Sequence, residues 1–151
     1  MRKLLCLLAL LVFATPLFAA DPFAGTWKLN TAKTKYTTGT PPKEITLVIE
    51  EQGPNLLVTA TGTNSDGSPI SVKYTVPISG GAGTMQEGDN SGITSKQISA
   101  NVRENNYSKD GKELRTRHMV VSKDGKTMTS KVKGTNPNGK LVDGTDVYDK
   151  Q

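Results

Sequence analysis

The sequence predicts an all-β fold, a single antiparallel up-and-down β-barrel of about 8–10 strands. Four turn signals divide the chain beyond its first third: Asp66-Gly67, Asp110-Gly111, Asp124-Gly125 and Asn138-Gly139. The last three are 14 residues apart, and each suits a two-residue hairpin, because a type I′ turn needs positive φ at both central residues. With about four residues for each turn, strands of roughly ten residues remain. Long strands joined by tight turns form a meander, which hides its edges when it closes on itself.

Alternating apolar residues locate the strands of the first half. The clearest alternation runs from Ile70 to Ile78, whereas Asn30–Lys43 is polar, ends in two prolines and is expected to be a loop. The glycine-rich stretch Gly80–Gly92 has room for at most one short strand. The expected strands are Phe23–Leu29, Ile45–Ile49, Leu56–Ala60, Ile70–Ile78, Ile93–Glu104, Lys112–Ser122, Lys126–Gly134 and Lys140–Lys150.

The later strands have no clearly apolar face. In Lys112–Ser122, Arg115 and Arg117 share one side with Met119 and Val121, and His118 lies on the other. Such strands suit a barrel with a partly polar interior, filled by mixed side chains or holding a ligand and water.

The first 20 residues have the pattern of a secretory signal peptide. Arg2 and Lys3 precede an apolar run over residues 4–13, and cleavage is expected after Ala19 or Ala20. The run is too short to span a bilayer, and a retained N-terminal anchor is the alternative. The sequence thus predicts a signal peptide over residues 1–20, one barrel domain over residues 21–151, and a secreted or periplasmic location.

The composition of the mature chain limits its chemistry. About 131 residues remain, enough for one domain. The only cysteine, Cys6, lies in the leader, so no disulfide is available. The formal charge falls from +5 to +3 when Arg2 and Lys3 leave. So mild a charge argues against a nucleic-acid partner. We expect a monomer with no membrane span in the mature chain.

Both ends of the mature chain resemble known families. Residues 23–29, Phe-Ala-Gly-Thr-Trp-Lys-Leu, resemble the Gly-x-Trp first strand of lipocalins and fatty-acid-binding proteins. Residues 147–150, Val-Tyr-Asp-Lys, are similar to the Arg-x-Tyr-x-Lys last strand of fatty-acid-binding proteins. The Asp-Gly-Lys turns on either side of Leu114–Val121 resemble late hairpins of that family. The chain therefore resembles a secreted bacterial lipocalin-like protein, a calycin-type barrel. The resemblance implies that the first and last strands pair and that Trp27 plugs one end.

Two departures from the fatty-acid-binding pattern bear on function. That family has two helices after its first strand, but here Asn30–Lys43 holds only 14 residues with two prolines, so no such lid is expected. The arginine that meets a ligand carboxylate in the family is Asp146 in this sequence, and an acidic residue repels a carboxylate. Arg117, or His118 beside it, lies closest to the other ligand-facing arginine of the family.

Five residues are candidate ligand contacts. Trp27 is expected as a barrel plug or a ligand contact, and Tyr148 as a ligand donor or a core tyrosine. Arg115 and Arg117 form a cationic cluster for an anionic head group if their face points inward. Otherwise they form a solvated stripe, or one of them pairs with Asp146. The candidate ligand-binding residues are Tyr148, Arg115, Arg117, Trp27 and Tyr74.

No catalytic residue, metal site or cofactor is predicted. His118 is the only histidine, whereas zinc requires three or four N, S or O ligands, and no nucleophile-turn motif accompanies it. The leading hypothesis is therefore a non-catalytic, secreted barrel that binds a small apolar or amphipathic ligand in its interior. The alternatives are a structural or interaction module of the cell envelope with a side-chain-filled barrel, and an enzyme with a carboxylate pair. The apolar positions expected to line or pack the barrel are Ile45, Leu47, Ile49, Val58, Ile70, Val72, Tyr74 and Met128.

Overall fold

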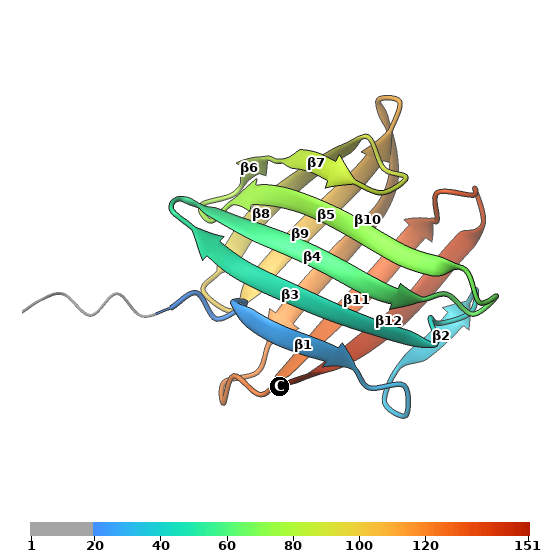
Figure 1. The fold of residues 1–151 in the computed structure, drawn as a ribbon, viewed down its shortest axis with the longest axis horizontal. Helices are drawn as coiled ribbons and strands as arrows, with labels where there is room; N and C mark the ends of the chain where they lie inside the picture. Colours follow the sequence, from blue (N-terminus) through green and yellow to red (C-terminus); the bar gives the residue numbers. More distant parts are fainter. Residues whose placement is uncertain (1–19) are drawn as a thin grey trace, which may run out of the picture.

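The computed structural model describes residues 20–151 of the chain. These residues form twelve antiparallel strands, arranged as a nearly closed barrel (Figure 1). The predicted signal peptide lies outside these described residues, apart from Ala20. The strands are β1 (Gly25–Leu29), β2 (Lys35–Thr38), β3 (Glu44–Gln52), β4 (Asn55–Thr63), β5 (Pro69–Pro77), β6 (Gly81–Ala82), β7 (Thr84–Glu87), β8 (Gly92–Ser99), β9 (Val102–Lys109), β10 (Lys112–Val121), β11 (Thr127–Thr135) and β12 (Leu141–Lys150).

The all-β antiparallel barrel is confirmed, but the strand number is twelve rather than about 8–10. Three additional short strands occur in segments expected to be mostly loop, and Ile93–Glu104 is a hairpin rather than one strand. The chain reverses at Ala100 and Asn101, between Ser99 of β8 and Val102 of β9, which lie opposite each other. This turn contains neither glycine nor proline, so the sequence carries no strong signal for it.

The first and last strands pair, as the resemblance implied. Trp27 of β1 lies opposite Lys150 of β12 on one side and Leu47 of β3 on the other. Its side chain is fully buried, and its indole Nε1 donates to the carbonyl oxygen of Phe23 at 2.8 Å. Trp27 is therefore a buried core side chain whose one polar atom is satisfied locally.

The segment expected as a loop after β1 contains β2, which pairs with β12 (Figure 1). Tyr36 lies opposite Gly144 in this pairing, and a side chain at Gly144 would collide with the Tyr36 ring. The hydroxyl of Thr34 accepts from the backbone N–H of Val147 at 3.1 Å and joins the turn before β2 to β12. The interval thus adds a strand to the barrel wall, and residues 20–151 include no helical lid.

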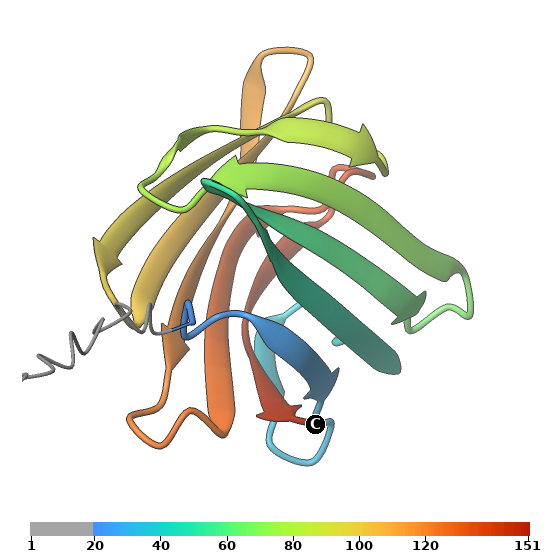
Figure 2. The same ribbon diagram turned by 60° about the vertical axis from the view of Figure 1, so that its left-hand side comes forward.

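One short segment closes the barrel between β5 and β8. β6 pairs with β8 and β7 pairs with β5, so the chain passes from one side of the seam to the other at Gly83 (Figure 2). A Cβ at Gly83 would collide with the Thr75 carbonyl oxygen and the Val76 side chain of β5, and would crowd the Ile93 side chain of β8. Glycine is therefore required where the two sides approach each other closely.

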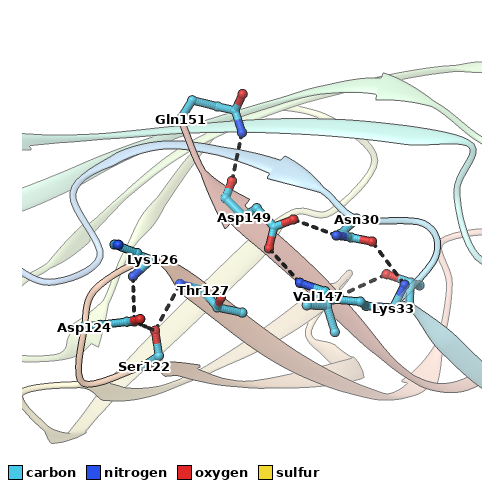
Figure 3. Close-up of polar contacts among 10 residues, drawn as sticks. Asn30, Lys33, Ser122, Asp124, Lys126, Thr127, Val147, Asp149 and Gln151 are labelled. Atoms are coloured by element: carbon cyan, nitrogen blue, oxygen red, sulfur yellow. Dashed lines mark hydrogen bonds and ion pairs between the residues drawn. The ribbon is translucent and has the colours of Figure 1, made fainter.

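The four turn signals all lie in turns, but only one has the predicted type I′ geometry. Asp110 and Gly111 both have positive φ, 51° and 76°, as that turn requires. The others are wider turns in which an Asp or Asn side chain accepts from a backbone N–H two residues on. In Figure 3, Asp124 accepts in this way from the backbone N–H of Lys126 at 3.1 Å and also from the Ser122 hydroxyl at 2.6 Å.

No helix in residues 20–151 has the length and apolar character needed to cross a membrane.

Candidate functional site

The barrel encloses a cavity of about 550 Å³. This volume lies within the range of small-molecule sites, roughly 300–1,000 Å³. The loops that border its mouth lie between β2 and β3, β4 and β5, β7 and β8, and β11 and β12. Phe23 and Met128 line the opposite end, which we call the floor. The barrel interior is therefore a site that a small molecule can occupy.

One wall of the cavity is apolar. It is formed by alternate residues of β3, β4 and β5, because successive side chains of a strand point to opposite faces. All eight apolar positions expected to line or pack the barrel line this cavity: Ile45, Leu47, Ile49, Val58, Ile70, Val72, Tyr74 and Met128.

The other wall, from β9 to β12 with β2, carries a hydrogen-bonded cluster around Asp146. The Asp146 carboxylate is fully buried and accepts from Arg117 Nη1 at 2.7 Å, Tyr36 Oη at 3.0 Å and Tyr148 Oη at 3.5 Å. Arg117 Nη1 also donates to the Ser130 hydroxyl at 3.2 Å. The structural pair with Asp146, one of the predicted alternatives, is thus present, and it compensates the charge of Arg117.

Between them, burial and neighbouring charges keep the two tyrosines and the arginine of this cluster protonated. Burial and the Asp146 carboxylate raise the pKa of Tyr36 to about 12, and the same two causes raise the pKa of Tyr148. Burial lowers the pKa of Arg117, but the Asp146 carboxylate and the neighbouring tyrosines together more than offset this and hold the pKa well above its usual value. At neutral pH both tyrosines are therefore hydrogen-bond donors and Arg117 is a cation.

A second polar group lies on β5 and β9. The hydroxyls of Tyr74 and Tyr107 are 3.0 Å apart, and their rings meet edge to face with centroids 5.9 Å apart. Asn105 Nδ2 donates to Tyr74 Oη at 3.3 Å. Burial and the neighbouring Tyr107 raise the pKa of Tyr74, which stays protonated. With Tyr36 and Tyr148, these residues bring all four tyrosines of the chain to one cavity.

Arg115 stands apart from these two groups because its charge has no carboxylate partner among residues 20–151. Its guanidinium carbon lies 4.9 Å from the centroid of the Tyr107 ring, a cation–π contact. Its Nε is buried and has no hydrogen-bond partner within the described chain. Burial and the neighbouring Arg117 lower its pKa. Arg115 thus supplies an uncompensated cation to the polar wall.

Four of the five predicted site residues line the cavity: Tyr74, Arg115, Arg117 and Tyr148. Trp27 is not among the lining residues, and the Lys150 ammonium lies 4.9 Å from its ring centroid. The face of β10 with Arg115 and Arg117 therefore points inward. His118 points outward, towards Glu104 of β9, with 3.6 Å between Nδ1 and Oε2.

Several residues of the site were not predicted from the sequence. Tyr36 belongs to the segment expected as a loop. Asn105 and Tyr107 lie beyond the expected strand end at Glu104, although their spacing places them on one strand face with Arg103. The signal for this face is the alternation within residues 102–109, which form a separate strand, β9.

Arg103 holds the floor of the barrel together. It is 1% exposed, and its Nη2 donates to the Ile78 carbonyl at 2.7 Å while Nη1 donates to the Ser95 hydroxyl at 2.9 Å. Its guanidinium carbon lies 5.7 Å from the centroid of the Phe23 ring. These contacts join the end of β5 to β8, so Arg103 has a structural part at the seam.

The strands and the cavity together define a nearly closed antiparallel β-barrel with a hollow interior. No family model and no curated protein matches the sequence. Among solved structures, the zebrafish ileal bile acid-binding protein complexed with cholic acid is similar with a TM-score of 0.50 and 12% identity, over 86% of this chain and 99% of that chain. A redesigned beta barrel, mFAP1, bound to DFHBI has a TM-score of 0.44 and 17% identity, over 87% of this chain and 98% of that chain. At 12% identity the first likeness establishes the fold alone.

Proposed function

We propose that this protein is a non-catalytic carrier that binds one small amphipathic molecule inside its barrel. The observation that carries the proposal is the division of the cavity into an apolar wall and a polar wall. The apolar wall from β3 to β5 would cover the body of the ligand. The polar wall, with Arg115 and Tyr148, would fix its orientation.

The cavity volume supports this function over that of a structural module with a side-chain-filled barrel. Such a module would leave a space below roughly 300 Å³, and the cavity measures about 550 Å³. The signal-peptide pattern of residues 1–20 supports secretion or a periplasmic location, and we propose that the mature protein acts there as a monomer.

A thermal-shift screen against fatty acids, sterols, quinones and haem, followed by calorimetry of the hits, tests the proposal. Val72 lines the cavity, whereas its neighbour Lys73 does not. A tryptophan at position 72 fills part of the cavity, so Val72→Trp should weaken binding by about tenfold or more. Lys73→Trp, the matched control, should leave affinity unchanged. The absence of any binding, or equal affinity in the two variants, would overturn the proposal.

A further inference from the structure

Four buried polar atoms of cavity-lining residues have no hydrogen-bond partner within the described chain: Asn90 Oδ1, Arg103 Nε, Asn105 Oδ1 and Arg115 Nε. Two of them, Asn105 Oδ1 on β9 and Arg115 Nε on β10, belong to neighbouring residues of adjacent strands. Asn105 is 1% exposed, and both residues line the cavity. Leaving a buried acceptor or donor unpaired is costly, so atoms of this kind in a cavity wall indicate the polar groups of its occupant.

The contacts of Asn105 fix which of its two polar atoms is left over. Its Nδ2 donates to Tyr74 Oη at 3.3 Å, and Tyr74 in turn lies 3.0 Å from the hydroxyl of Tyr107. Because Tyr74 accepts from Asn105, it can give its own proton to Tyr107, and the Tyr107 proton is then available to a ligand. This chain of donors leaves Asn105 Oδ1 as an acceptor and Tyr107 as a donor.

Arg115 lies next to Asn105 and Tyr107. It requires a hydrogen-bond acceptor, whereas Asn105 Oδ1 requires a donor. The β9–β10 register places Tyr107 opposite Arg115 and Asn105 opposite Arg117, so Asn105 and Arg115 are diagonal neighbours on the inner face. Arg117 is held by Asp146 at 2.7 Å, but Arg115 has no carboxylate partner in residues 20–151. The site therefore requires acceptor oxygens for Arg115 and Tyr107, and a donor for Asn105.

We propose that the polar end of the ligand combines an anionic oxygen with an adjacent hydroxyl donor, and that Asn105 determines this specificity. The anionic oxygen would pair with Arg115 and the hydroxyl would donate to Asn105 Oδ1. A plain carboxylate would accept from Arg115 and Tyr107 but would offer no donor to Asn105 Oδ1 and would bring two acceptors together there. This inference rests on the proposed function and narrows its ligand class to hydroxylated anionic amphiphiles.

Calorimetric titration of the unmodified protein with dodecanoate and with 3-hydroxydodecanoate tests the inference. We expect the hydroxylated acid to bind about tenfold or more tightly, since the plain acid leaves a buried acceptor unpaired. Asn105→Leu should remove the preference by weakening only the hydroxylated ligand. Asn106→Leu is the matched control because Asn106 points outward and accepts from the Thr116 hydroxyl at 2.7 Å; it should retain the preference.

The outcomes separate this inference from the proposed function. Equal affinity for the two acids, or tighter binding of dodecanoate, would overturn the role of Asn105 while leaving ligand binding intact. If the Asn105→Leu variant still preferred the hydroxylated acid, a residue other than Asn105 would determine the specificity. Failure of both acids to bind would count against the hydroxylated anionic ligand, and failure of the whole ligand screen as well would overturn the proposed function. The comparison of ligands on the unmodified protein decides the question even if Asn105→Leu does not fold.

Discussion

Replacing Asp146 with asparagine should destabilise the barrel strongly, because it removes the charge that compensates Arg117. Breaking a buried ion pair on one side typically costs 3–5 kcal/mol. The Asp146 side chain is fully buried, whereas that of Arg117 retains 19% exposure and some hydration. This partial exposure places the expected loss of unfolding free energy at the lower end, about 3 kcal/mol. Urea denaturation followed by circular dichroism measures it.

Two further variants test the cause of that loss. Arg117→Met combined with Asp146→Leu removes both charges and should recover most of the stability, because apolar residues can replace a buried ion pair with little loss. Asp149→Asn is the matched control on the same strand. Asp149 is partly exposed and pairs with Lys33 at 3.4 Å and with Asn30 at 2.6 Å (Figure 3), so its loss should change stability little. A loss below about 1 kcal/mol for Asp146→Asn, or a double variant as unstable as the sum of its parts, would refute this reasoning.

Three other predictions follow from residues around the same interior. Burial raises the pKa of Tyr36 from its usual value near 10 to about 12. The unfolded chain therefore loses this proton first, and the free energy of unfolding should fall as pH rises between these values. Tyr36→Phe should make the free energy of unfolding, measured by urea titration at a series of fixed pH values, depend less steeply on pH. An unchanged pH dependence in this variant would contradict the prediction. Gly144→Ala would press a methyl group against the Tyr36 ring and should cost about 1–3 kcal/mol in urea denaturation. Gly92→Ala, which meets only the flexible Ser108 side chain, should cost less, and equal losses would count against this contact. Because Trp27 is fully buried outside the cavity lining, ligand binding should leave its fluorescence emission unchanged, and a shift on binding would place it in contact with the ligand.

The apolar wall was predictable because its signal is local. Alternation through Ile70 and Ile78 follows from the two-residue period of a strand, whatever the rest of the chain does. The turn at Asp110-Gly111 was predictable for the same reason, since positive φ at both positions is a property of the turn itself.

The polar wall was less predictable because it depends on distant partners. Tyr36 belongs to a strand only because it packs on Gly144, more than one hundred positions along the chain. The alternation of Arg115 and Arg117 placed them on one face but did not say whether it points inward, since charged side chains ordinarily face water. Arg117 points inward because it pairs with the buried carboxylate of Asp146, and only the assembled barrel brings these two residues together.

Both ends of the described chain lie at the floor of the barrel, away from its mouth. The backbone N–H of Gln151 donates to the carbonyl oxygen of Thr26 at 2.9 Å, close to where β1 begins (Figure 1). A tether attached at either end would therefore hold the barrel to a sensor surface with its mouth facing the solution. Immobilisation by one terminus and by the other should consequently give the same ligand association rate.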